Sequence, residues 1–102
     1  MERFEALQEE GALILVDVFA SWCGTCAIQQ EVLANFQKDN PGVPLYQLTV
    51  DFDDQKRYVR HFRAPRQSTL ILYHGGEQVW FSIAETNSDA IYAAINEAAA
   101  AL

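Results

Sequence analysis

The pattern of hydrophobic and polar positions changes along the chain between the period of a strand and that of a helix. Residues 12–20 (ALILVDVFA) form a nearly continuous apolar run rich in branched side chains, which is typical of a strand buried on both faces. Residues 44–52 alternate in character, which indicates a strand with two unlike faces. Residues 24–39 instead repeat apolar side chains at helical spacing, which predicts an amphipathic helix between these strands.

The remaining elements are bounded by turn and capping signals. Gly75 and Gly76 separate two apolar runs and predict a hairpin, because paired glycines tolerate positive φ. Asp53 or Asp54 is expected to cap a short helix. In chain order we expect a helix at 2–10, a strand at 12–20, a helix at 24–39, a strand at 44–52, a helix after 53–54, strands at 69–73 and 78–84, and a helix from Asn87 or Ser88 to about Ala101.

This order of elements predicts the fold class. Strands separated by helices pair in parallel through right-handed crossovers, whereas the closing hairpin adds antiparallel strands. We therefore expect an α/β fold with a mixed four-stranded sheet flanked by helices on both faces. With 102 residues, half of them hydrophobic, the chain suffices for a single domain over residues 1–102 and is too short for two ordinary ones.

Charge and hydropathy narrow the classes of partner. A formal net charge of −7 disfavours nucleic acid and anionic membranes, because phosphate groups bind clustered Lys and Arg. No stretch approaches the roughly 20 apolar residues of a spanning helix, and the acidic start MERFEALQEEG differs from a signal peptide. We expect a cytoplasmic protein that acts as a monomer.

Two cysteines lie three positions apart where the first strand gives way to a helix. The N-terminus of that helix favours a thiolate at Cys23, and the thiolate is the nucleophile in disulfide exchange. Cys26 is close enough along the helix to form a disulfide with it. A zinc site would need two further ligands, and His61 and His74 lack the usual spacing. Disulfide exchange is therefore favoured over metal binding and simple packing.

Two motifs resemble the thioredoxin family. VDVFASWCGTC at 16–26 resembles the strand and active site of that family, and TLILYHGGE at 69–77 resembles its hairpin. The likeness extends over essentially the whole chain, except that the family's extra N-terminal strand is missing, which leaves residues 45–52 at the sheet edge. It implies a thioredoxin-like fold and a thiol-disulfide oxidoreductase acting on protein or small-molecule disulfides. A redox-active Cys23–Cys26 disulfide would then serve as the redox group, with no other cofactor.

The resemblance also assigns roles to individual residues. Cys23 matches the attacking cysteine, Cys26 the resolving cysteine, and Asp17 the buried carboxylate that exchanges a proton with the resolving thiol. Burial would raise the pKa of Asp17 and make it a usable base near neutrality. The other interpretation of Asp17 is a strand-end residue that reaches solvent. The substrate-binding residues implied are Trp22, Gly24, Thr25, Arg66, Ser68, Thr69 and Ala84, and no metal ligand is expected.

Several positions depart from the family pattern. Ser68 stands where the family has a cis-proline, and a trans bond is expected there because a non-proline cis bond costs about 3 to 4 kcal/mol. Its hydroxyl could hydrogen-bond a thiolate. Thr25 replaces the proline between the cysteines, which weakens the reducing bias, and Ala84 replaces a glycine, which narrows the groove. Gln47 replaces a lysine, so the pKa of Asp17 is expected to rise further.

The basic residues are concentrated in one segment. Five of the seven fall within residues 56–66, which lead into Ser68. Lys56 and Arg57 are interpreted as part of a solvated helix face, whereas Arg63 and Arg66 are hypothesised to steer an acidic partner or a glutathione-like carboxylate to the site.

The sequence leaves one alternative function open. The chain could be a thioredoxin-like binding or adaptor module whose CxxC binds metal or an iron–sulfur cluster between two chains, or docks a partner without turnover. The expected partners of the enzyme are a disulfide-containing protein substrate and a protein or small-thiol reductant. A reductant of this kind is needed because the sequence has no dinucleotide-binding fingerprint.

Overall fold

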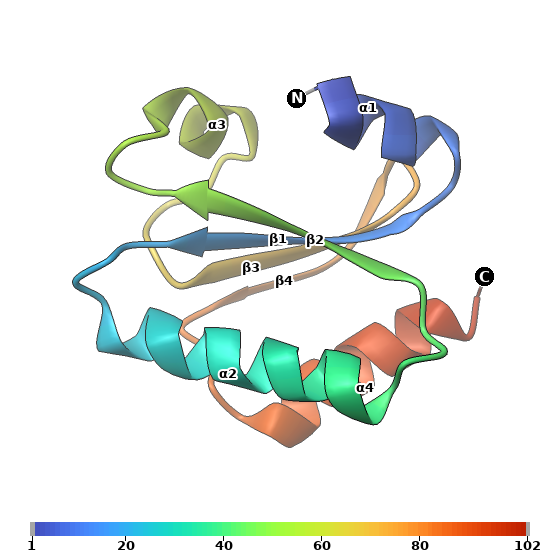
Figure 1. The fold of residues 1–102 in the computed structure, drawn as a ribbon. Helices are drawn as coiled ribbons and strands as arrows, with labels where there is room; N and C mark the ends of the chain where they lie inside the picture. Colours follow the sequence, from blue (N-terminus) through green and yellow to red (C-terminus); the bar gives the residue numbers. More distant parts are fainter. Residues whose placement is uncertain (1, 102) are drawn as a thin grey trace.

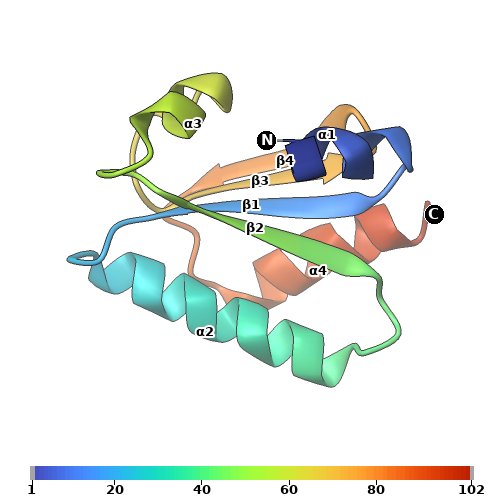
Figure 2. The ribbon, with the colours of Figure 1, turned by 45° about the horizontal axis from the view of Figure 1, so that its top comes forward.

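The computed structural model describes residues 2–101, which form helices and strands in the order that the sequence predicts (Figure 1). The elements are α1 (Glu2–Glu9), β1 (Leu13–Phe19), α2 (Gly24–Asp39), β2 (Leu45–Asp51), α3 (Lys56–His61), β3 (Thr69–His74), β4 (Glu77–Ile83) and α4 (Ser88–Ala99). Helices α1 and α3 lie on one face of the sheet, and α2 and α4 lie on the other (Figures 1 and 2). None of these helices is long and apolar enough to cross a membrane.

The sheet has the strand order β2-β1-β3-β4 and is mixed, as expected. Strands β1 and β2 are parallel, whereas β1 with β3 and β3 with β4 are antiparallel. The end of β1 therefore lies beside the start of β3, where Val18 pairs with Thr69. Strand β2 forms one edge of the sheet, which confirms the prediction for residues 45–52.

The continuous apolar run of β1 is explained by its central position. Its side chains alternate between two hydrophobic clusters, one on each face of the sheet. Leu13 and Leu15 pack in the cluster shared with α2 and α4, and Val16 and Val18 pack in the cluster shared with α1 and α3. By the same alternation Asp17 faces α2 and α4, and it is 0% exposed. The fold thus places a carboxyl group inside the protein.

The turn between β3 and β4 has a backbone conformation that favours glycine. Gly75 has φ +62° and is buried, and its N–H donates to the Ala12 carbonyl at 2.8 Å. A Cβ at this position would lie 3.4 Å from the Cα of Gly11, an ordinary contact, so glycine is favoured here by the positive φ. The hairpin that the sequence predicts at this glycine pair is therefore confirmed.

The predicted cap of the helix at residues 56–61 is wrong. The N-cap of α3 is Gln55, and no side-chain bond caps the helix. Asp53 and Asp54 instead donate their backbone N–H groups to the Asp51 carboxylate, at 2.9 and 3.1 Å. The Asp51 side chain thus closes a turn at residues 51–54, and the helix begins only after Gln55. Asn87 caps α4, as expected.

Candidate active site

The two cysteines lie at the start of α2, directly after the chain leaves β1. Cys23 is the N-cap residue, with extended backbone angles, and its sulfur accepts a hydrogen bond from the backbone N–H of Cys26 at 3.2 Å. Cys23 is half-buried, whereas Cys26 is 1% exposed. Both are free thiols. The Cys23 sulfur is therefore accessible to a substrate, whereas the Cys26 sulfur is shielded from it.

The surroundings shift the pKa values of these thiols in opposite directions. Burial raises the pKa of Cys23, but hydrogen bonds from the Cys26 and Ser68 side chains and from the backbone of Cys26 and Thr25 outweigh it, so the pKa is lowered. Burial raises the pKa of Cys26, and the neighbouring Cys23 raises it further, against hydrogen bonds from Ser68 and the Ala20 backbone. Cys23 is therefore the first thiol to ionise and the better nucleophile at neutral pH.

Ser68 lies against both sulfurs. Its Oγ is 3.1 Å from the Sγ of Cys23 and 3.1 Å from the Sγ of Cys26. The side chain is 1% exposed, and the backbone has φ +66°. No peptide bond within residues 2–101 is cis, so the trans bond expected before Ser68 is confirmed.

Gln29 is a site residue that the sequence analysis missed. It lies on α2, one turn after Cys26, and its side chain is fully buried. Its amide Nε2 donates to the Ser68 carbonyl at 3.0 Å and to the Glu85 carbonyl at 2.9 Å. The available signal was a polar residue on the helix face that otherwise carries buried apolar side chains such as Leu33.

Ala84, like Ser68, has a left-handed backbone conformation. Ala84 has φ +62°, and its N–H donates to the Ser68 carbonyl at 2.9 Å. For residues other than glycine this conformation costs roughly 1 to 2 kcal/mol each. Two residues with strained backbones thus lie beside the cysteines. Proteins tend to concentrate such strain at functional sites.

The loop before β3 forms several hydrogen bonds within the protein. The Ser68 N–H donates to the Val18 carbonyl at 2.8 Å, and the buried Thr69 hydroxyl donates to the Arg66 carbonyl at 2.6 Å. The Arg66 side chain is exposed. Gln67 is half-buried, and its backbone forms no hydrogen bond with the rest of the described chain. The N–H and the carbonyl of Gln67 are therefore free for further hydrogen bonds.

Trp22, Gly24 and Thr25 form the rim of the site on the side of the cysteines. Trp22 is 63% exposed, and its indole N–H donates to the Asp53 carboxylate at 2.7 Å. Gly24 and Thr25 begin α2, where Gly24 is exposed and Thr25 is half-buried. Asp53, a residue that the sequence analysis treated as a helix cap, thus holds the indole in place.

Asp17 is buried without a hydrogen bond. Neither carboxyl oxygen has a partner in hydrogen-bonding geometry, and no hydrogen bond joins it to the exposed Gln47. Burial raises the pKa of Asp17 to about 6, and the nearby side chain of Gln30 only partly opposes this shift. The interpretation of Asp17 as a solvent-exposed strand end is therefore wrong.

Comparisons with known proteins agree with this geometry. The family model described as Thioredoxin matches residues 2–97. The chain belongs to the thioredoxin family. Thioredoxin of Chlamydia trachomatis is 32% identical over 85 residues, which cover 83% of this chain and 81% of that protein. Thioredoxin H-type of Fagopyrum esculentum is 28% identical over 76% of this chain and 66% of its own length.

Solved structures show the same relationship. Trxlp from Edwardsiella tarda is 39% identical, with a TM-score of 0.84, over 90% of this chain and 89% of that chain. Mitochondrial thioredoxin 3 from Saccharomyces cerevisiae, at 21% identity and a TM-score of 0.79, covers 94% of this chain and 88% of its own and shows the fold alone. Proteins named thioredoxin are disulfide oxidoreductases, and this member of the thioredoxin family is one as well.

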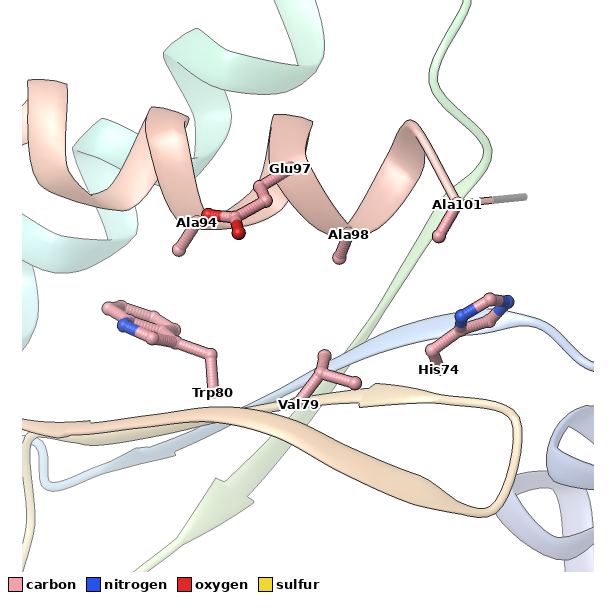
Figure 3. A pocket seen from close by; sticks show the side chains of 7 residues that line it. All are labelled: His74, Val79, Trp80, Ala94, Glu97, Ala98 and Ala101. Atoms are coloured by element: carbon pink, nitrogen blue, oxygen red, sulfur yellow. The ribbon is translucent and has the colours of Figure 1, made fainter.

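A separate cavity of this thioredoxin-family chain lies between β4 and α4 (Figure 3). Its volume is about 250 Å³, and Ala94 and Ala98 point into it from α4, toward Trp80 and Val79 of β4. His74 at its rim pairs with Leu13 at the start of β1, whereas the cysteines follow the end of β1. The cavity is therefore remote from the disulfide chemistry.

Proposed function

We propose that this oxidoreductase exchanges its Cys23 and Cys26 thiols with a protein disulfide, with Cys23 as the attacking and Cys26 as the resolving residue. The observation that carries the proposal is the pairing of a half-buried thiol of lowered pKa with a buried thiol of raised pKa, three residues apart. This asymmetry supports a fixed order of attack, because the thiolate is the reactive form.

The reaction consists of two balanced exchanges. The Cys23 thiolate attacks one sulfur of the substrate disulfide, forming a mixed disulfide while the other substrate sulfur leaves as a thiolate. Deprotonated Cys26 then attacks the Cys23 sulfur, so that the Cys23–Cys26 bond forms and the second substrate sulfur leaves. Two electrons pass from the dithiol to the substrate. A protein or small-thiol reductant returns them in the cytoplasm, and the disulfide is the redox group, with no further cofactor.

We assign Asp17 as the group that accepts the Cys26 proton before the second exchange. Asp17 faces the helix that carries Cys26, and its pKa of about 6 makes it a usable base near neutrality. The Cys26 thiol has a raised pKa and ionises poorly without a base. A buried carboxylate without hydrogen bonds is therefore suited to the resolving step.

The substrate-binding surface follows from the residues around the cysteines. We propose that a substrate segment lies along the Gln67 backbone, between the rim residues and Ala84. The proposed binding residues are Trp22, Gly24, Thr25, Arg66, Ser68, Thr69 and Ala84. Arg63 and Arg66 are exposed beside this surface, and segment 56–66 carries five basic residues and no acidic one. Charge therefore favours an acidic partner, which this surface would attract over distances of about a Debye length.

Neutralising both arginines tests the charge preference. An Arg63→Gln/Arg66→Gln variant is expected to react about tenfold more slowly with an acidic disulfide peptide at low ionic strength, and with a weaker salt dependence. The matched control is Lys56→Gln/Arg57→Gln, which removes the same charge further from Ser68, where Lys56 already lies over the Phe52 ring. Equal slowing in both variants would mean that the rate depends on the net charge of the protein, and it would contradict steering by Arg63 and Arg66.

A redox titration tests the proposed function itself. Metal-stripped protein is equilibrated in a graded series of dithiothreitol buffers, alkylated and weighed by mass spectrometry. We expect one reversible two-electron transition between the dithiol and the Cys23–Cys26 disulfide. Failure to form this disulfide in any buffer would refute the proposal and favour a binding module. The relationship to proteins named thioredoxin favours the enzyme over that alternative.

A further inference from the structure

The Ser68 hydroxyl is a buried polar group in contact with both reacting sulfurs. Its oxygen lies 3.1 Å from each Sγ, although the sulfurs belong to α2 and Ser68 belongs to the loop before β3. With 1% of its surface exposed, the residue has no effective access to water. The hydroxyl must therefore form its hydrogen bonds with the sulfurs.

The position of this hydroxyl is fixed by the backbone that carries it. The Ser68 N–H donates to the Val18 carbonyl, and its carbonyl accepts from the Ala84 N–H and from the Gln29 side chain. These bonds tie the residue to β1, α2 and the segment after β4. Moving the oxygen away from the sulfurs would break buried hydrogen bonds, which is costly.

The donor and acceptor roles follow from the number of protons. A hydroxyl has one proton to donate and two lone pairs to accept with. Because Cys23 ionises first, the favourable arrangement has Ser68 donating its single proton to the Cys23 thiolate. Donation to an anion is stronger than donation to a neutral group. In the disulfide both sulfurs are neutral, so this hydrogen bond is largely lost on oxidation.

We propose that Ser68 stabilises the reduced, Cys23-thiolate form and thereby makes the Cys23–Cys26 disulfide more oxidising than the same site without the hydroxyl. The inference rests on the proposed function, since it concerns the equilibrium of that couple. The hydroxyl keeps its proton throughout, and electrons pass only between sulfurs. A couple whose reduced form is stabilised accepts electrons more readily.

A Ser68→Ala variant tests this role, because it keeps the Cβ and removes only the hydroxyl. We expect the pKa of Cys23, measured from the pH dependence of its alkylation rate, to rise by about one unit, a tenfold change in the thiolate equilibrium. The equilibrium constant with glutathione should shift about tenfold toward the disulfide, or about 30 mV toward reducing potentials. Ser68→Gly should behave alike, and it suits the left-handed backbone if the alanine variant fails to fold.

A matched control and a linked variant complete the experiment. Ser82→Ala removes another buried hydroxyl, one without a hydrogen-bond partner, and is expected to leave both values unchanged. Gln29→Met removes one anchor of Ser68 and should shift both values in the direction of Ser68→Ala, by a smaller factor. If the Ser68 variants keep the wild-type pKa of Cys23 and the wild-type equilibrium, the inference is overturned while the proposed function stands. If wild-type protein forms no disulfide, the proposed function fails instead.

Discussion

A Cys26→Ser variant is expected to stop at the mixed disulfide, with the substrate bound covalently to Cys23. The serine hydroxyl does not attack a disulfide, so the second exchange is blocked while the first proceeds through the Cys23 thiolate. Multiple turnover should fall to background. Intact mass spectrometry after incubation with oxidised glutathione should show one added glutathione per chain, removed by dithiothreitol.

The matched control is Cys23→Ser, which also has a single thiol, but the remaining thiol is the buried Cys26. Cys26 is 1% exposed and has a raised pKa, so this variant should capture little glutathione over the same period. Equal capture by the two variants would contradict the assignment of Cys23 as the attacking residue. Capture by Cys23→Ser alone would reverse the two roles.

The second large effect is expected for Asp17→Asn, which should be more stable than wild type near pH 8 by about 2 kcal/mol. In the folded protein burial raises the pKa of Asp17 from its ordinary 3.8 to about 6. Between these values the folded state binds more protons than the unfolded state, so stability falls as pH rises through this window. The unfolding free energy of the wild type falls by about 3 kcal/mol through this window. The variant avoids this loss, but burying its amide without hydrogen bonds costs part of the gain, which leaves about 2 kcal/mol.

Urea unfolding at about pH 5 and about pH 8 measures this effect, and the variant should show a smaller decrease in unfolding free energy between these conditions than wild type. The control is Asp54→Asn, an exposed carboxyl group that should change stability little. The same Asp17→Asn variant should prolong the mixed disulfide, because the proposed base for Cys26 is gone. A stable variant with an unchanged resolving rate would remove Asp17 from the proton transfer without affecting the stability argument.

The sequence predicts the elements of this fold well because their signals are local. The apolar run around Asp17 indicates a buried central strand, and the structure shows that strand between two neighbours. The glycine pair marks the hairpin, and the change of period after Cys23 marks the start of α2. The cap of α3 is missed because Asp51 competes for the turn by accepting from two successive backbone N–H groups.

The site is less predictable because its decisive contacts join distant segments. Gln29 and Ser68 are 39 positions apart in the sequence, and no local pattern indicates that the amide of one meets the carbonyl of the other. The left-handed backbone of Ser68 and Ala84 is also hidden, since neither residue type favours it. What the sequence does indicate is the chemistry of the cysteines and the carboxyl group, which depends on residue types and on burial.

The anchoring of Ser68 has a consequence for how partners are chosen. Its backbone is tied to β1 through Val18, to α2 through Gln29 and to the segment after β4 through Ala84. A loop held on three sides changes shape little when a partner docks, so little conformational entropy is lost in the encounter. It also cannot adapt to a poorly fitting chain. The rigid loop would thus select disulfides whose flanking residues already fit its shape and would bind other disulfides more weakly.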